Sequence, residues 1–402
     1  FGYNALVLNT TGASNVAMGQ FSLDANTTGS LNTAVGHNAL TANIGSGLNT
    51  AVGAGAMELN TSGDYNTAVG RNALSANTTA NQNTAVGMEA LLSNTTAADN
   101  TALGYQALRA NTTATNNTAV GAGALRSTVT GAGNTALGTA SQYASTGASN
   151  TSVGMNSMRF NTSGATNTAV GKSSLTTCTT GAHNTVMGAS AGFGITTGSS
   201  NVVIGHDAGV AITTGGTNTT IGKLAGDTIT TGFNNVCIGA STDVASATAS
   251  YQYVLGHGIT SAANTFSFGQ SGSVVSNVFT TNASWARSSD KRKKTNIEPT
   301  DLGLNFINEL RPVTFNWKDS SEFPEGFKDK DIAEMNTETN LYGMIAQEVK
   351  AAMDKVGHEN FGGWSEDDDG SQKLSQEMFI YPLIKAVQEL STQVDELKQE
   401  LL

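Results

Sequence analysis

The chain has 402 residues, of which 46 are glycine and only 4 are proline, and its formal net charge is −11. The acidic balance argues against a nucleic-acid partner, because such proteins present a basic surface to the phosphates. No apolar run approaches the ~20 residues of a membrane-spanning helix, no signal peptide is visible, and two cysteines are too few for a disulfide framework. Residues 1–280 hold 6 Lys or Arg and 8 Asp or Glu, which leaves 14 and 23 for the rest, so we place a domain boundary near residue 280.

A 17-residue repeat fills residues 1–239. Each unit is anchored on an asparagine at position 0 and has glycine at position 4, with Val, Leu, Ile or Met just before that glycine. The typical unit reads Asn-Thr-Ala-Val-Gly, two variable residues, Ala-Leu, two more, then Asn-Thr-Thr-Gly. Every step is 17 residues except one of 16, which separates two late anchors, Asn134 and Asn150. The fourteen anchors are Asn15, Asn32, Asn49, Asn66, Asn83, Asn100, Asn117, Asn134, Asn150, Asn167, Asn184, Asn201, Asn218 and Asn235.

This unit predicts one coil of a β-solenoid. Thr-Ala-Val is a short strand whose alternation puts Thr and Val on one face and Ala on the other. Ala-Leu is expected to supply a second short edge, and Asn-Thr-Thr-Gly to turn the chain. A unit this short cannot bury a core alone, whereas stacked units can. At the strand spacing of ~4.8 Å, fourteen coils make a shaft roughly 65–70 Å long.

Two positions of the repeat change together, which predicts a shared buried seam. Position 8 is usually Leu or Met and position 11 is usually Asn, which we expect to form a stacked amide ladder. In three late repeats position 8 becomes Gly and position 11 becomes Ile, so an apolar side chain leaves one site and appears at the other. The examples are Leu40, Leu74 and Leu108 with Asn43, Asn77 and Asn111, against Gly192, Gly209 and Gly226 with Ile195, Ile212 and Ile229.

The repeats offer no pattern of catalytic or metal-binding residues. Histidines occupy variable positions, and acids such as Glu58, Asp64 and Glu89 do not recur at one position. A calcium-binding roll would need Gly and Asp at a nine-residue period, so we expect neither metal nor cofactor. Cys178 and Cys237 are interpreted as small apolar fillers.

The anchor pattern of residues 1–239 resembles the head repeats of trimeric bacterial adhesins. Those repeats read Asn-Ser-Val-Ala-Ile-Gly and form a left-handed β-roll in a trimer, and similar repeats occur in phage tail fibres. The period here is longer. The resemblance implies a trimeric β-roll and leaves the ligand open.

Residues 240–286 break the period. Apolar alternation persists in 251–255 and 266–268, which predicts a β-rich neck, and Asn264 with Gly269 is interpreted as a degenerate last repeat.

Residues 287–402 have an ordinary composition and read as a small α+β domain. Leu304, Ile307 and Leu310 have helical spacing, and after Pro312 the residues up to Trp317 alternate like a strand. Further helices are predicted to start at Tyr342 and Tyr381. Apolar residues then alternate by four and three, which predicts a coiled coil over about 380–402. They are Leu383, Val387, Leu390, Val394, Leu397 and Leu401.

The blocks from Arg287 onward are similar to the intramolecular chaperone domain of phage endosialidases and tail fibres, a family also classed as self-cleaving serine peptidases. The segment Arg-Ser-Ser-Asp-Lys-Arg-Lys-Lys-Thr-Asn-Ile, residues 287–297, carries the family's Ser-Asp with a lysine five residues after the serine. The resemblance implies trimerisation, assisted folding of the preceding fibre, and autocleavage by Ser289 with Lys294, Asp290 being part of the motif. Which of the neighbouring lysines faces Ser289 stays open, as does the alternative that Ser289 merely ends the neck and the domain is retained.

Together these observations predict a homotrimeric tail fibre of a phage virion, extracellular, that binds a host cell-surface receptor, a glycan or an outer-membrane component. Membrane insertion is not expected, and any enzymatic activity would be a single autoproteolytic event. One alternative is a bacterial trimeric surface adhesin, which would normally end in a membrane-anchoring β-barrel instead of a coiled coil. Another is a glycan depolymerase tailspike, which would need paired or recurrent carboxylates.

Overall fold

The computed structural model describes residues 1–262, 264–278, 286–287, 289, 291–326, 337–338 and 340–401. The chain divides into two compact units, Phe1–Ser288 and Ser289–Leu402, each described below by itself.

The structure is mainly β, as predicted. The first unit contains β1 (Val16–Met18), β2 (Thr33–Val35), β3 (Thr50–Val52), β4 (Thr67–Val69), β5 (Thr84–Val86), β6 (Thr101–Leu103), β7 (Thr118–Val120), β8 (Thr135–Leu137), β9 (Thr151–Val153), β10 (Thr168–Val170), β11 (Thr185–Met187), β12 (Val202–Ile204), β13 (Thr219–Ile221), β14 (Val236–Ile238), β15 (Tyr253–His257), β16 (Thr265–Gln270), β17 (Ser273–Val278) and β18 (Ala286–Arg287). The second contains the 3-10 turns η1 (Lys291–Lys293), η2 (Ser320–Glu322) and η3 (Gln376–Phe379), the helices α1 (Leu304–Glu309), α2 (Ala346–Lys355) and α3 (Ile380–Glu400), and the strands β19 (Val313–Phe315), β20 (Leu341–Gly343), β21 (Trp364–Glu366) and β22 (Gln372–Leu374).

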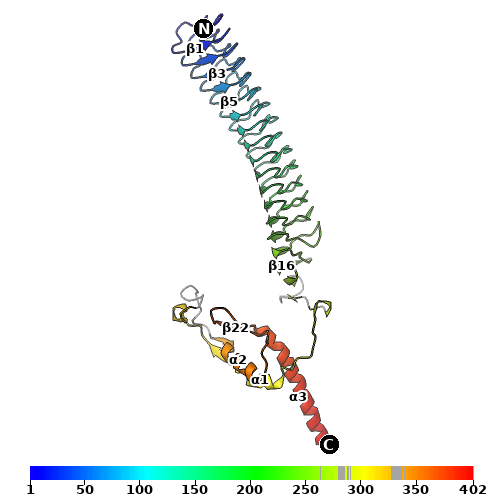
Figure 1. The fold of residues 1–402 in the computed structure, drawn as a ribbon. Coiled ribbons are helices and arrows are strands. Elements are labelled where there is room, and N and C mark those ends of the chain that lie inside the picture. The colour runs from blue at the N-terminus through cyan, green and yellow to red at the C-terminus, as the bar shows by residue number, and fades with distance from the viewer. Residues whose placement is uncertain are drawn as a thin grey trace. The chain divides into compact units, whose positions relative to one another are not determined.

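The repeats form the predicted β-solenoid (Figure 1). Strands β1 to β14 are three residues each and pair in parallel with the strand one coil further on, in a register that places Thr50 opposite Thr67. Ala at position 2 is buried, whereas Thr and Val on either side are half-exposed. Alanine therefore points into the coil and Thr and Val form its outer face.

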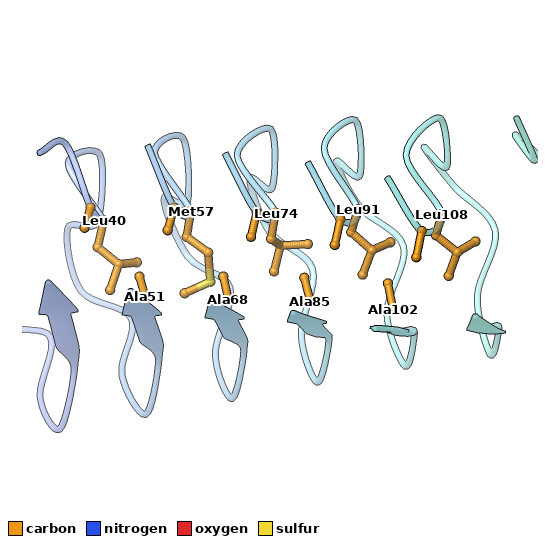
Figure 2. Packing of buried hydrophobic residues seen from close by; sticks show 14 of the residues in the cluster. Leu40, Ala51, Met57, Ala68, Leu74, Ala85, Leu91, Ala102 and Leu108 are labelled. Atoms are coloured by element: carbon orange, nitrogen blue, oxygen red, sulfur yellow. The ribbon is translucent and has the colours of Figure 1, made fainter. Parts of the chain in front are cut away.

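One large side chain per coil fills the interior. Figure 2 shows Leu40, Met57 and Leu74 at position 8 of successive coils, lying beside the strand alanines. These side chains are fully buried. The core is thus a narrow column of stacked leucines and alanines, which explains why each coil needs its neighbours.

The Ala-Leu segment is not a second strand, contrary to the sequence prediction. Asn38 and Leu40 both have left-handed φ angles, 57° and 55°, and residues of this kind cannot continue an extended backbone. The segment still joins successive coils, because the Leu40 backbone N–H donates to the Ala56 carbonyl at 3.1 Å.

Glycine at position 4 is required by the stacking. Gly70 has a φ of 136°, and a Cβ placed on it would lie 2.6 Å from the carbonyl oxygen of Gly87 in the next coil. Any other residue would clash with backbone atoms in addition to the strain of that φ. This explains the glycine in all fourteen units.

The shared seam of positions 8 and 11 is confirmed. Ile212 is fully buried, and a Cβ on Gly209 would lie 2.8 Å from its Cδ1 atom. The same Cβ would lie 3.3 Å from Cγ1 of Val203, which occupies position 2. Position 2 is Ala in most early coils and Val or Thr here, so three positions, not two, exchange volume.

The amide ladder at position 11 is also confirmed. From Asn26 to Asn111, each buried Nδ2 group donates to the Oδ1 atom of the asparagine one coil earlier, over 2.7–3.3 Å. A second ladder runs along the anchors and was not predicted. The backbone N–H at each position 0 donates to the Oδ1 atom of the preceding anchor over 2.9–3.1 Å, beginning with Asn32 to Asn15 and ending with Gln252 to Asn235.

Both cysteines are buried and not disulfide-bonded, as predicted. Cys178 takes the place of asparagine at position 11 and Cys237 that of alanine at position 2. Burial raises the pKa of the Cys178 thiol to about 11 and that of Cys237 to about 12.

The solenoid continues into the region predicted to break the period. Gln252 stands in for an anchor asparagine, and β15 pairs in register with β14, with Gly256 at position 4. A shorter coil follows, in which Gly269 lies opposite Gly256, so Gly269 is a repeat glycine as expected while Thr265, not Asn264, takes the anchor position. Antiparallel pairing of β17 with β16 then ends the parallel stack.

The second unit is a small α+β domain around an aromatic core. Phe306 of α1 contacts Phe361 and Phe379, with ring centroids 5.5 and 6.4 Å away, and Val349 and Met353 of α2 pack beside them. Helix α1 and the start of α3 lie where they were predicted. The helix expected from Tyr342 was placed too early, because Tyr342 pairs with Thr314 in the β19–β20 ladder and α2 begins at Ala346.

Candidate functional site

Ser289 and Lys294 are in direct contact. The Lys294 Nζ group donates a hydrogen bond to the Ser289 Oγ atom over 2.6 Å. The 3-10 turn η1 lies between them, and the Lys294 backbone N–H closes it by donating to the Lys291 carbonyl at 3.1 Å. This turn brings a lysine five residues after the serine back to its side chain.

The contact distinguishes among the basic residues of the segment. Sequence analysis left open which lysine faces Ser289, and the structure places Lys294 there. Lys291 and Arg292 are exposed members of η1. Asp290, the third residue of the predicted site, lies outside the described residues.

A serine next to a lysine amine is a pairing that can perform nucleophilic catalysis, provided the amine loses its proton. Desolvation favours the neutral amine of a lysine. Both side chains are exposed in the single chain. The two side chains are therefore close enough for proton transfer. The single chain does not bury them, and burial is what would favour the neutral lysine amine.

The position of the pair in the chain suits a cleavage site. Ser289 is the first residue of the second compact unit, and β18, which pairs with β17, ends just before it. Scission of the backbone beside Ser289 would therefore separate the two units without cutting through either hydrophobic core.

Ion pairs connect the helices of the second unit with neighbouring segments. Arg311 binds Glu348 of α2 through two nitrogens, its Nε atom at 3.0 Å, and Lys355 binds Glu309 of α1 at 2.7 Å. The Glu389 carboxylate of α3 accepts a hydrogen bond from the Leu304 backbone N–H at 2.7 Å, at the start of α1. This pairing of a carboxylate with a helix N-terminus joins segments that are 85 residues apart.

One pair of carboxyl groups does come together in the shaft, which the sequence analysis did not anticipate. Burial, and next a hydrogen bond with Asp243, raise the pKa of Asp227. The two lie at positions 9 and 8 of consecutive coils. Among the described residues, no three His, Cys, Asp or Glu side chains gather in a way that could hold a metal ion, and no helix has the length and apolar character to cross a bilayer.

Comparison with known proteins assigns the second unit. Residues 289–358 match the family model Peptidase_S74, described as chaperone of endosialidase. That match begins at Ser289 and includes Lys294, α1 and α2. Neither curated proteins nor solved structures gave a match. The second unit thus carries an intramolecular chaperone domain of the endosialidase type, and it follows a β-solenoid of 17-residue repeats.

Proposed function

We propose that this chain is a homotrimeric fibre of a phage virion tail, in which the second unit aligns and folds three shafts and then severs itself at Ser289. The observation that carries this proposal is the attachment of an endosialidase-type chaperone domain to a highly self-similar shaft.

The shaft has a register problem that such a domain would solve. Successive coils present nearly identical strands, so a chain displaced by one coil along its neighbours would meet almost the same side chains. A domain that joins three chains at one end removes this ambiguity and lowers the cost of bringing distant segments together.

Helix α3 supports association of the chains. Its heptad positions Leu383, Val387, Leu390, Val394 and Leu397 are all exposed in the single chain. Apolar residues at this spacing bury themselves by packing helices against one another. The predicted coiled coil would thus give three chains a common start.

The proposed cleavage follows the chemistry of a Ser-Lys pair. Neutral Lys294 takes the proton of Ser289 Oγ as that oxygen attacks an adjacent backbone carbonyl, and the peptide nitrogen leaves as an amine carrying the proton. Water then hydrolyses the resulting ester. Association of three chains would supply the desolvation that the single chain lacks.

Denaturing gels of purified protein test the cleavage. The wild type should release a fragment corresponding to residues 289–402, whereas Ser289→Ala and Lys294→Arg should remain full length. Lys291→Arg is the matched control and should be processed normally, since Lys291 contributes only a backbone carbonyl near the site. An unprocessed wild type would exclude autocleavage.

Removal of residues 289–402 tests the chaperone role. Expressed without them, residues 1–288 should be aggregated or monomeric, whereas the full chain should sediment as a trimer. Soluble trimers of the truncated chain would contradict the role.

Attachment to a host receptor, a glycan or an outer-membrane component, is tested by binding the assembled fibre to host cells and to immobilised glycans.

A further inference from the structure

The outer face of the shaft sheet carries two uninterrupted columns of side chains. Position 1 is Thr or Val in all fourteen coils, and position 3 is Val, Leu, Ile or Met. Both are half-exposed or exposed, because the strand turns only the position-2 residue inward. Pairing in strict register aligns each column coil by coil. We call these two columns the sheet stripe.

The sheet stripe differs from the rest of the shaft surface at position 3, which is apolar in every coil, whereas positions 10, 12 and 13, which also lack charge, are mostly Ala, Ser or Thr. No charged residue occurs at position 1 or 3 of any coil, whereas the charged residues of the shaft lie in other columns. Other exposed apolar residues do not persist: Leu31, Leu48 and Tyr65 are followed in their column by Gln82 and Asp99. Long contiguous apolar patches are rare on free surfaces and mark sites of association.

The sheet stripe becomes aromatic at its C-terminal end. Register places Tyr253 and Leu255 of β15, then Phe266 and Phe268 of β16, in the same two columns. The rings of Tyr253 and Phe266 are stacked with centroids 6.4 Å apart, and Phe268 is exposed. Aromatic residues contribute most strongly to protein interfaces.

The dimensions fit an interface between chains. Fourteen coils at ~4.8 Å, with two columns covering a width of ~10 Å, give a stripe of roughly 600–700 Å². A stable interface buries ~800 Å² per partner, so the stripe with its aromatic end approaches that size.

The period of the sheet stripe identifies the occupant. A partner can match the apolar column at position 3 coil by coil along the whole shaft only if it repeats at the same spacing, and another copy of this chain does so. The exposed heptad residues of α3 indicate association of copies independently. We propose that the sheet stripe faces the axis of the trimer and that its aromatic end is where the shafts first meet. This inference rests on the proposed homotrimer and adds which face of each shaft is buried.

Disulfide cross-linking of the full chain tests the face. Leu137 lies in the stripe and is 47% exposed, whereas Leu48 lies outside it and is 45% exposed, so the two are a matched pair. On a trimer axis, like residues meet at equal height. Leu137→Cys should therefore give a dimer-sized band on a non-reducing denaturing gel, and Leu48→Cys should not. Cys178 and Cys237 are buried and should not contribute.

Sedimentation distinguishes failure of this inference from failure of the proposed trimer. If the protein sediments as a trimer but Leu137→Cys does not cross-link, or Leu48→Cys cross-links equally, the sheet stripe is not the interface while the proposed trimer stands. If the wild type sediments as a monomer, both are wrong.

The double variant Leu103→Lys with Leu137→Lys gives a second readout. Burying two charges should make the shaft, but not the second unit, more sensitive to protease, and unchanged sensitivity would overturn the inference.

Discussion

At the residue scale, the shaft is stabilised by asparagines that satisfy one another. A buried amide is costly without partners and inexpensive with them. Asn77 donates to Asn60 at 2.7 Å and to the Ala80 carbonyl at 3.1 Å, and it accepts from Asn94 at 3.3 Å. Each amide thus serves the coils before and after it.

Replacing one member of this ladder should therefore cost more than its own contacts. Asn77→Ala leaves the buried Asn60 oxygen without its donor. It also removes one bond each from the Asn94 amide and the Ala80 carbonyl, which keep their bonds to Ala97 and Asn66. We expect a loss of about 1–3 kcal/mol in the free energy of unfolding. Thr79→Ala, an exposed change two residues away, is the control and should be nearly neutral. Thermal or denaturant melts of both variants would show the difference, and equal melts would contradict the ladder's contribution.

At the element scale, the coil of 16 residues divides the shaft. The apolar core forms one cluster that ends at Ala136 and another that begins at Met158. Between them the interior is polar: Gln142 takes position 8, and Ser141 bonds Ser152 at 2.6 Å. Several buried polar atoms nearby have no hydrogen-bond partner in the described structure, among them Gln142 Oε1 and Thr128 Oγ1. We therefore expect the shortened coil to be the weakest part of the stack.

Restoring leucine to this coil should strengthen it. Gln142→Leu removes an unsatisfied buried oxygen and rejoins the leucine column, at the cost of one bond from Gln142 Nε2 to Asn134. We expect a gain on the order of 1–2 kcal/mol and a higher melting temperature. Gln82→Leu is the matched control, because Gln82 also has a left-handed φ, 60°, but is exposed. A lower melting temperature for Gln142→Leu would show that the polar interior is stabilising.

At the scale of the whole molecule, the shaft is a stack in which each coil contacts only its neighbours. Stability of such a stack is close to a sum over coils and their interfaces. We therefore expect that whole coils can be removed from the shaft without unfolding it, whereas removal of part of a coil should disrupt the stack.

Deleting residues 33–117, five complete coils, should leave a folded trimer whose shaft is shorter by ~24 Å. Deleting residues 33–109 removes fewer residues but joins an anchor to the middle of a coil. That variant should misfold or aggregate, because glycine and asparagine columns no longer align across the junction. Electron microscopy of both would measure the lengths, and two equally folded variants would refute the requirement for register.

The sequence by itself determined the repeat, the solenoid and the seam of positions 8 and 11. These follow from local chemistry: glycine where a side chain would clash, and an apolar residue once per period. Only the tertiary structure decided that alanine faces inward and Thr and Val outward, because alternation alone does not show which of the two faces is buried. It also revealed the anchor ladder and the fifteenth coil, because Gln252 donates its backbone N–H to Asn235 whatever its side chain is. The structure likewise shows that Lys294 is the basic residue that contacts Ser289, because η1 folds it back to the serine. Four adjacent basic residues all lie near Ser289 in the sequence, so their spacing alone could not distinguish among them.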